Sequence, residues 1–492
     1  MYHPTLKEAR ELAASGPYRE IPVARELLSD FLTPIQALRI LRAQDGHCFL
    51  LESAADSEGW GRWSFLGFEP ELEITCKDGL LRLRGQDGPV TTRRQAPEAA
   101  LRSILTDRAS PRIPGLPPFT GGLVGYFSYD YIKYAEPALR LDARDDEGFQ
   151  DMDLMLFRNV IAFDNYRQKL ILITNADARD LDVSYPAACA QLDRMAELLR
   201  HGSPAPRRPA RLTTPVRPLF GKEEFCSMVE RAKAHIREGD IFQVVLSNRL
   251  EAGFEGSLLD VYRILRTVDP SPYLFYFTSD DMELAGASPE TLVKLEDGVL
   301  HTFPLAGTRP RGRTPEEDAA LEADLLSDGK ELSEHDMLVD LGRNDLGKIS
   351  RFGSVTVERH RSVERFARVM HLGSTVRGEL AEGRDAVDAI GAILPAGTLS
   401  GAPKLRAAEI IDALEDNKRG VYGGAVGYLS FTGDLDTGIA IRLAFAKNGK
   451  VFVRSGAGIV ADSVPEKEHQ ECINKASAVV RALELAQRER DL

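Results

Sequence analysis

The stretch IAIRLAFAKNGKVFVRSGAG, residues 439–458, contains two alternating apolar segments joined by the dipeptide Asn448-Gly449. Asn-Gly between two such segments predicts a two-residue type I′ turn and therefore an antiparallel hairpin. Elsewhere, hairpin-like segments are mixed with helical ones, without regular βαβ units or a fixed-period repeat. We therefore predict an α+β fold and not a doubly wound sheet. Strands are expected at 47–53, 121–134, 241–250, 273–278 and 293–304, and helices at 185–200 and 222–238.

The predicted hairpin also places one charged side chain. With a two-residue turn, Arg442 would lie opposite Ser455 and beside Gly456 and Gly458. Alternation would put Arg442 among alanines on one face, where small neighbours leave room for a ligand. A solvent-facing arginine on an edge strand explains the same pattern equally well. The opposite face would carry Ile439, Ile441, Leu443 and Phe445.

Composition limits the classes of function. The chain has 492 residues, 62 Lys+Arg against 75 Asp+Glu, and a formal net charge of −13, which argues against a general nucleic-acid binder. We see neither an apolar signal segment at the start nor a stretch long enough to span a bilayer, so we expect no membrane association. The five cysteines form no paired motif, which favours reduced thiols and a cytoplasmic location.

Two pairs of glutamates have helical spacing. Glu331 and Glu334 lie three residues apart in GKELSEHDMLVD, and Glu468 and Glu471 repeat that spacing near the C-terminus. Each pair would share one helix face. If the pairs met, each contact would cost roughly 4 kcal/mol at about 4 Å and an effective dielectric near 20. A Mg²⁺ ion would remove that cost. Two independent solvated faces remain the alternative.

Taken together, the motifs of the C-terminal half resemble the chorismate-utilising enzymes, and within them the large subunits of anthranilate synthases. The similarity is nearly continuous from about 220 to 478, and a further portion runs from about 20 to 165. The matching motifs are IREGDIFQVVLSNR (236–249), DPSPYLFYF (269–277), GASPETLVK (286–294), PLAGTRPRGR (304–313), KELSEHDMLVDLGRNDLG (330–347), RVMHLGSTVRG (368–378), LPAGTLSGAPKLRAAEIID (394–412), YGGAVGY (422–428), SGAGIVADS (455–463), LLES (50–53), GRWSFLG (61–67) and GGLVGYFSYD (121–130).

The resemblance implies a large β-sandwich covered by helices, with an N-terminal portion packed on a C-terminal catalytic core. We place an effector-binding domain at 15–170 and a chorismate-binding catalytic domain at 219–485. The Pro- and Arg-rich segment 200–218 between them is typical of a linker.

The resemblance also implies a set of site residues. Mg²⁺ would be surrounded by Glu331, Glu334, Glu468 and Glu471, and would carry the ring carboxylate of chorismate. Arg442 would form a bidentate fork with the enolpyruvyl carboxylate. Further substrate contacts would come from Gly307, Thr308, His371, Tyr422, Gly456, Gly458 and Lys475.

Two positions indicate which reaction of the family is run. Relatives that add water to the ring use a lysine base where this chain has Gln243, and an amide can orient neutral ammonia but is no useful base. Relatives that aminate carbon 4 carry a nucleophilic lysine where this chain has Ala306. Both positions favour amination at carbon 2. By the same resemblance, Glu290 would protonate the departing 4-hydroxyl, His371 would act in pyruvate loss, and Thr308 would assist.

The resemblance also implies partners for this chain. No cysteine lies in a G-x-C-x-G turn, so a separate glutamine amidotransferase subunit is expected to supply ammonia. Family members in tryptophan synthesis bind tryptophan as an inhibitor, and the usual NPSPYMF reads DPSPYLF here, with Asp269 and Leu274. The expected tryptophan-binding residues are Glu52, Ser53, Pro272, Tyr273, Leu274, Phe275 and Tyr428.

The function indicated is amination of chorismate with pyruvate elimination to anthranilate, the first step of tryptophan biosynthesis. The alternatives are an enzyme that stops at 2-amino-2-deoxyisochorismate, an anthranilate synthase of a specialised pathway, and an inactive effector-binding homologue.

Overall fold

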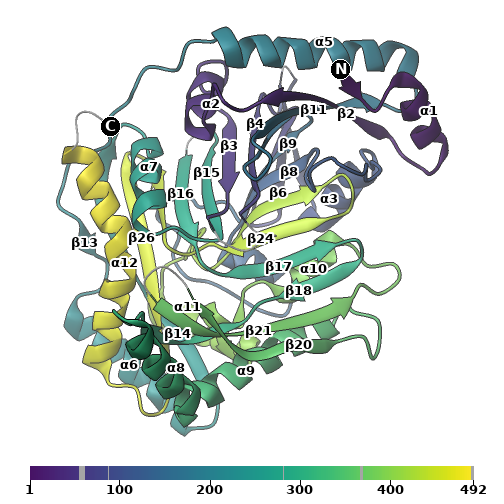
Figure 1. Cartoon of the computed structure of the whole chain (residues 1–492). Coiled ribbons are helices and arrows are strands. Elements are labelled where there is room, and N and C mark those ends of the chain that lie inside the picture. Colours follow the sequence, from purple (N-terminus) through teal and green to yellow (C-terminus); the bar gives the residue numbers. More distant parts are fainter. Residues whose placement is uncertain (55–60, 87, 281, 366–368, 489–492) are drawn as a thin grey trace.

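The structure is a computed structural model, which describes residues 1–492 except 55–60, 87, 281, 366–368 and 489–492. Its described residues form two large sheets of antiparallel strands (Figure 1). In spatial order, the first sheet contains β1 (Tyr2–His3), β2 (Glu20–Leu28), β11 (Lys169–Asp177), β10 (Val160–Asp164), β4 (Trp63–Phe68), β3 (Cys48–Glu52), β15 (Tyr273–Thr278), β16 (Met282–Ser288), β25 (Leu443–Lys447), β26 (Lys450–Ile459) and β14 (Gln243–Glu255), with β12 (Arg211–Leu212), β13 (Arg217–Pro218) and β22 (Gly401–Ala402) paired to β14.

The second sheet also combines strands from both halves of the chain, and the strands of each half lie next to one another. In spatial order it contains β19 (Leu305–Pro310), β21 (Val369–Glu379), β18 (Val299–Thr302), β17 (Thr291–Glu296), β24 (Leu435–Ile439), β23 (Ala425–Ser430), β8 (Gly122–Phe127), β9 (Met152–Phe157), β5 (Leu72–Lys77), β6 (Leu80–Gly85) and β7 (Thr91–Arg94), with β20 (Thr356–Arg365) on β21.

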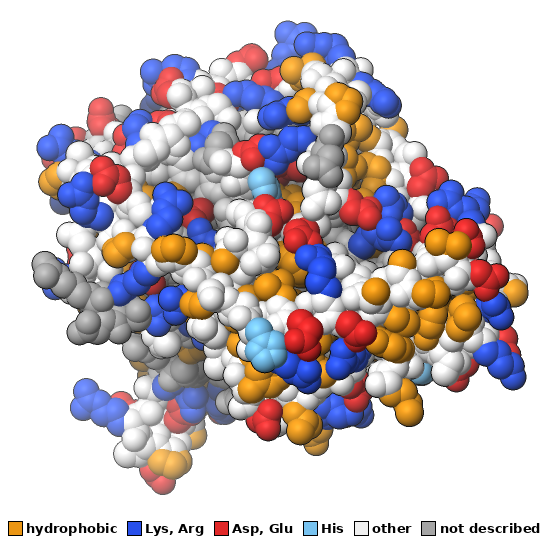
Figure 2. All heavy atoms as spheres, turned by 90° about the horizontal axis from the view of Figure 1, so that it is seen from above, with side chains coloured by type: hydrophobic (Ala, Val, Ile, Leu, Met, Phe, Trp, Pro, Cys, Tyr) orange, Lys and Arg blue, Asp and Glu red, His pale blue; other side chains and the backbone are white. Residues whose placement is uncertain are grey.

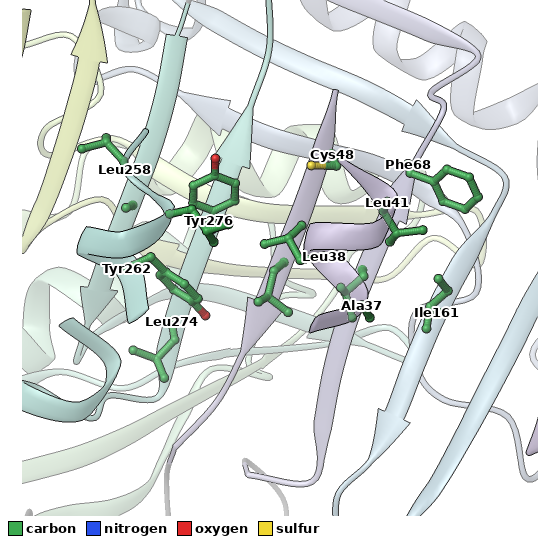
Figure 3. Close-up of a cluster of buried hydrophobic side chains, with 14 of the residues drawn as sticks. Ala37, Leu38, Leu41, Cys48, Phe68, Ile161, Leu258, Tyr262, Leu274 and Tyr276 are labelled. Carbon is green, nitrogen blue, oxygen red and sulfur yellow. The ribbon is translucent and has the colours of Figure 1, made fainter. Parts of the chain in front are cut away.

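Helices cover the outer faces of both sheets. Apolar side chains of α1 (Leu6–Ala14), α2 (Pro34–Leu41), α5 (Leu181–His201), α7 (Leu259–Val268) and α12 (Pro465–Arg488) join the core on the first sheet. Figure 3 shows part of this core, where Leu38 and Leu41 of α2 and Tyr262 of α7 lie over the strands. The other helices are α3 (Pro97–Thr106), α4 (Ile132–Ala135), α6 (Lys222–Arg237), α8 (Pro315–Ser327), α9 (Gly329–Gly347), α10 (Ala386–Ile393) and α11 (Lys404–Glu415), with 3₁₀ turns η1 (Tyr129–Tyr131) and η2 (Gly397–Leu399).

A second core, rich in aromatic rings, fills the space between the sheets. Phe49 of β3 meets Phe157 of β9 edge to face, with ring centroids 4.8 Å apart. The predicted α+β sandwich covered by helices is thereby confirmed. The two predicted domains contribute strands to both sheets, and the boundary between them stays a prediction. The segment predicted as a linker contains the short strands β12 and β13.

Charged side chains of both signs are mixed on the face of the molecule that Figure 2 shows. In Figure 2, the face seen from above carries acidic and basic side chains interspersed over the coloured part of the molecule. In the part of the chain that the structure describes, none of the helices combines the length and apolar character that crossing a bilayer requires.

The hairpin turn is as predicted, but the strand before it is shorter. Lys447 pairs with Lys450, and Asn448 and Gly449 have φ of +54° and +71°, as a type I′ turn demands. The predicted continuous strand from Ile439 is wrong: Ile439 ends β24 in the second sheet, and β25 starts at Leu443 in the first. The apolar alternation in the sequence runs across 439–447 without a break because the end of β24 and the start of β25 are both apolar. A further correction concerns 121–134, where the strand ends at Phe127 and helical turns follow.

The chain thus crosses between the sheets at Ala440–Arg442, and a second crossing lies beside it. There β16 of the first sheet continues into β17 of the second through Pro289 and Glu290. The crossings exchange backbone hydrogen bonds: the Ile439 N–H donates to the Glu290 carbonyl (2.9 Å), and the Ala287 N–H donates to the Arg442 carbonyl (3.1 Å). These hydrogen bonds hold the two crossings together, so Glu290 and Arg442 lie on neighbouring segments between the sheets.

We expect Phe157→Ala to lower the free energy of unfolding by about 3–5 kcal/mol, because the cavity would open between two packed sheets. Tyr166→Ala removes a ring that is 83% exposed and should change the free energy of unfolding by less than about 0.5 kcal/mol. Urea unfolding followed by tryptophan fluorescence compares the variants. Equal midpoints would contradict a continuous core between the sheets.

Candidate active site

A cleft of about 1950 Å³, counted with its open side, lies where the two crossings meet α9 and α12. Every catalytic, substrate and metal residue predicted from the sequence lines it. These residues are Gln243, Glu290, Gly307, Thr308, Glu331, Glu334, His371, Tyr422, Arg442, Gly456, Gly458, Glu468, Glu471 and Lys475.

The two glutamate pairs face this cleft from different helices. Glu331 and Glu334 come from the first turns of α9, and Glu468 and Glu471 from the first turns of α12. Burial raises the pKa of Glu334, and the charges of the other three glutamates raise it further against the nearby Lys330. The four carboxylates therefore act on one another through space, although the two pairs lie 134 or more residues apart along the chain.

Cations partly balance this acidic cluster. The Lys475 Nζ lies 2.7 Å from Glu471 Oε1, the Lys330 Nζ 3.7 Å from Glu334 Oε1, and an Arg309 nitrogen 3.9 Å from Glu331 Oε1. Among the described residues, the sets with ligand atoms within 4.8 Å of one another are His47, Glu73 and Asp280, and His235, Glu238 and Asp240. The four glutamates are spaced more widely, yet their all-oxygen donor set and mutual repulsion fit a hard divalent cation.

Two glycines make room for polar side chains on the floor of the cleft. A Cβ on Gly458 would lie 2.8 Å from Gln243 Nε2, and one on Gly456 would lie 2.8 Å from Tyr422 Oη. Both glycines lie in β26 opposite β14, the strand that begins at Gln243. The Lys475 Nζ donates to the Gly456 carbonyl (3.2 Å) and so joins α12 to this floor.

A buried ionic cluster supports the floor from below. Glu415 accepts hydrogen bonds from both Arg419 and Arg454, and all three side chains are at most 3% exposed. Arg419 also donates to the carbonyls of Leu399 (2.6 Å) and Val245 (2.7 Å). Two cations and one carboxylate leave a positive charge beneath a cleft whose walls are acidic. This cluster could not be predicted from the sequence, since nothing local in NKRG or FVRSG marks its arginines as buried.

Glu290 has the environment of a proton donor. Burial raises the pKa of its carboxyl to about 7, against a hydrogen bond from the Thr398 hydroxyl to Oε1 (3.1 Å). A carboxyl group with such a pKa is protonated in a large fraction of molecules near neutral pH. Thr398 was not among the predicted residues, although its motif LPAGTLSGAPK had been recognised as part of the resemblance.

His371, Thr308 and Gly307 form one structural unit. Thr308 pairs with His371 across β19 and β21, and the register shifts at Gly307, whose φ is +63°. The His371 Nδ1 lies 3.1 Å from the Gly307 carbonyl and 3.0 Å from Thr308 Oγ1. Burial lowers the pKa of His371, so the ring is neutral. A carbonyl can only accept, so we infer that Nδ1 carries the proton and that Nε2 is the basic nitrogen.

Arg442 reaches the cleft by another route than the one predicted. It precedes β25 with a φ of +50°, and the pairing with Ser455 is wrong because the β25–β26 ladder stops at Ala444 and Val453. Its Nη1 lies 3.1 Å from both carboxylate oxygens of Asp269. Left-handed backbone at a bulky residue is uncommon and gathers at functional positions. Asp269 is the position where DPSPYLF departs from the usual asparagine, but its partner could not be found from the sequence.

A second pocket, of about 840 Å³ with its open side, lies between the sheets and apart from the cleft. Glu52 accepts hydrogen bonds there from Tyr262 Oη (2.6 Å) and Arg266 Nη2 (2.9 Å), both on α7. The Ser53 hydroxyl is buried and has no hydrogen-bond partner among the described residues. This pocket contains all of the residues predicted to bind an effector: Glu52, Ser53, Pro272, Tyr273, Leu274, Phe275 and Tyr428.

Comparison with known proteins agrees with this arrangement. A family model described as "chorismate binding enzyme" matches residues 5–481. This chain belongs to the chorismate-binding enzyme family. Relatives within that family include "Anthranilate synthase component 1" of Acetivibrio thermocellus, 43% identical with 99% of both chains covered, and of Pseudomonas aeruginosa, 45% identical over 98% of this chain and 99% of that one.

Solved structures show the same family fold. Anthranilate synthase component I from Streptococcus pneumoniae aligns with a TM-score of 0.78 at 40% identity, covering 92% of this chain and 99% of that one. The menaquinone-specific isochorismate synthase from Escherichia coli aligns with a TM-score of 0.69 at 21% identity, over 97% and 99% of the two chains, and shares the fold. The resemblance seen in the motifs is thereby confirmed.

We expect the carboxyl group of Glu290 to titrate near pH 7, because burial disfavours its charged form. Infrared difference spectra between pH 5.5 and 8.5 should show a protonated-carboxyl band that Glu290→Gln removes and Glu382→Gln, at an exposed position, keeps. A band that Glu290→Gln leaves intact would contradict the assignment.

Proposed function

We propose that this chain is the synthase component of an anthranilate synthase, which aminates chorismate at carbon 2 with ammonia and then eliminates pyruvate. The reaction balances as chorismate and ammonia giving anthranilate, pyruvate and water. The observation that carries the proposal is that the acid Glu290, the amide Gln243, the cation Arg442 and two glutamate pairs line a single cleft. The names of the relatives support the same activity.

The residues of the cleft divide the work between binding and proton transfer. Arg442 would bind the enolpyruvyl carboxylate in place of Asp269, and Tyr422 would add a hydroxyl donor. Gln243 would orient ammonia towards carbon 2, as an amide beside the small Gly458 can do. Glu290 would give its proton to the 4-hydroxyl group as the C4–O bond breaks. In the second step, the neutral His371 would take the proton from carbon 2 through Nε2.

Glu331, Glu334, Glu468 and Glu471 would hold a Mg²⁺ ion, whose charge would neutralise the ring carboxylate of the substrate. The support for this ligand set is that all four carboxylates line one cleft from two different helices, where burial and their mutual repulsion raise the pKa of Glu334. Ala306, which also lines the cleft, has a methyl group that cannot act as a nucleophile, and this favours amination at carbon 2 over carbon 4.

Ammonia would come from a separate glutamine amidotransferase subunit, as the name component 1 of the relatives suggests. All five cysteines are free thiols, which supports a reducing compartment such as the cytoplasm. The role in tryptophan biosynthesis follows from the proposed product.

Tryptophan would inhibit the enzyme from the second pocket. The Ser53 hydroxyl is available there, while Glu52 would have to share its contacts with Tyr262 and Arg266. Helix α7 carries Tyr262 and Arg266, and Asp269, the partner of Arg442, follows its last residue. A ligand that moves α7 would therefore change the position of Arg442 in the cleft.

The proposed activity predicts anthranilate fluorescence when the chain is incubated with chorismate, Mg²⁺ and ammonium salt at alkaline pH, and its loss with a chelator. Glu334→Gln and Glu471→Gln should each lower kcat/KM by at least ~10-fold, the smallest effect typical of residues that support a metal site, because a carboxylate is lost where charge must be balanced. Glu382→Gln, on the surface, is the matched control. Full activity in either cleft variant would refute the metal assignment. Amination without anthranilate, or chorismate binding without turnover, would favour the alternatives.

Tryptophan inhibition predicts that millimolar tryptophan lowers turnover. Ser53→Ala should weaken tryptophan binding roughly three- to tenfold, the usual effect of one hydrogen bond. Titration calorimetry measures it, with the exposed Ser103→Ala as control. Turnover unaffected by millimolar tryptophan would indicate a specialised pathway.

A further inference from the structure

A third cavity borders the cleft at Glu290. Its empty space is about 430 Å³ with its open side, and the centres of water molecules can occupy about 40 Å³ of it, which is room for a few waters. Glu290, Leu338 and Thr398 line both this cavity and the cleft. The carboxyl group proposed as the acid therefore stands in the wall between two hollow spaces.

One stripe of α9 lines both spaces in succession. Glu331 and Glu334 face the cleft, Leu338 borders both, and Leu341 and Asp345 face the cavity. Spacings of three and four residues keep these side chains on one helix face. Gly342 also lines the cavity, and its missing side chain contributes to the empty space.

Polar groups line the cavity at two places. The Thr398 hydroxyl donates to Glu290 Oε1. Asp345 accepts hydrogen bonds from the largely buried Lys404 (2.7 Å) and from Lys348 (3.3 Å), whose side chain is 43% exposed. Thr291 and Thr302 also line the cavity, but their hydroxyl groups bond to Tyr273 and to the Leu292 carbonyl. Water in such a cavity would find several hydrogen-bonding partners between a buried acid and the surface.

We propose that this cavity holds a chain of water molecules that returns a proton to Glu290 after each turnover. The inference rests on the proposed function. In each cycle Glu290 gives one proton to the 4-hydroxyl oxygen, the C4–O bond breaks, and water leaves. The ammonia nitrogen, once bound to carbon 2, releases one proton to solvent. One proton then passes from solvent near Lys348 and Asp345 through the cavity to the Glu290 carboxylate, so that protons balance.

Gly342 offers a way to fill the cavity without touching the cleft. A Cβ there would lie 3.1 Å from Thr302 Cγ2 and 3.6 Å from Pro304 Cγ, so Gly342→Ala needs a shift of a few tenths of an ångström and Gly342→Val a larger one. Alanine favours a helix more than glycine does, which offsets the cost of that shift, so Gly342→Ala should fold. Gly347→Ala is the matched control. Gly347 belongs to the same helix, and a Cβ there would lie in open space, with nothing described within 4 Å.

Stopped-flow fluorescence of anthranilate separates the first turnover from later ones. The enzyme is equilibrated at pH 6, where a carboxyl group with a pKa of about 7 is mostly protonated, and is then mixed with chorismate, Mg²⁺ and excess ammonium salt. The first turnover of both Gly342 variants should then equal that of the wild type. The steady-state rate should fall progressively, by roughly tenfold in Gly342→Val, which is less than the ~10²-fold expected for removing the acid itself. A burst of one product per site would then precede the slow phase, and Gly347→Ala should behave as the wild type.

Folded Gly342 variants with wild-type steady-state rates would overturn the inference. A first turnover slowed as much as the later ones would also overturn it, because the substitution would then act on the position of Glu290 and not on its return to the protonated form. If Gly342→Val does not fold, Gly342→Ala decides. A wild-type chain that makes no anthranilate refutes the proposed function instead.

Discussion

Two neighbouring crossings between the sheets are the constraint on which the site depends. The chain passes from the first sheet to the second through Pro289 and Glu290, and between the two sheets again at Ala440–Arg442. These two crossings lie side by side. Their backbone hydrogen bonds, from Ile439 to Glu290 and from Ala287 to Arg442, fix a carboxyl group and a guanidinium group between the sheets. The aromatic core on one side and the helices α9 and α12 on the other then close the space around them.

Several charges of the cleft are paired with one another inside the protein. Arg442 is paired with Asp269, Lys475 with Glu471 and Lys330 with Glu334. A dianionic substrate and a divalent cation would replace such internal pairs with contacts to each other and to the protein. The exchange costs little because the internal pairs are partly exposed, where ion pairs are weak. Substrate binding therefore uses charges that are already in position.

The sequence predicted the fold class, the type I′ turn and the pocket membership of the site residues. It failed at 439–442, because an apolar alternation continues unchanged while the chain passes from one sheet to the other. It also failed to find Thr398 and Asp269 as partners of Glu290 and Arg442. Those contacts join positions 108 and 173 residues apart, and local patterns carry no signal for them. The motifs located the residues, whereas the structure supplied their neighbours.

The most direct test of the central claim is calorimetric titration of chorismate, with Mg²⁺ present, into a Glu290→Gln chain with and without Arg442→Gln. In that background, turnover is expected to be blocked, so binding can be measured at equilibrium. If both crossings hold the same molecule, Glu290→Gln binds chorismate without converting it, and adding Arg442→Gln weakens the affinity by at least ~30-fold, as loss of a charged hydrogen-bonded pair does. An affinity unchanged by Arg442→Gln would contradict the account.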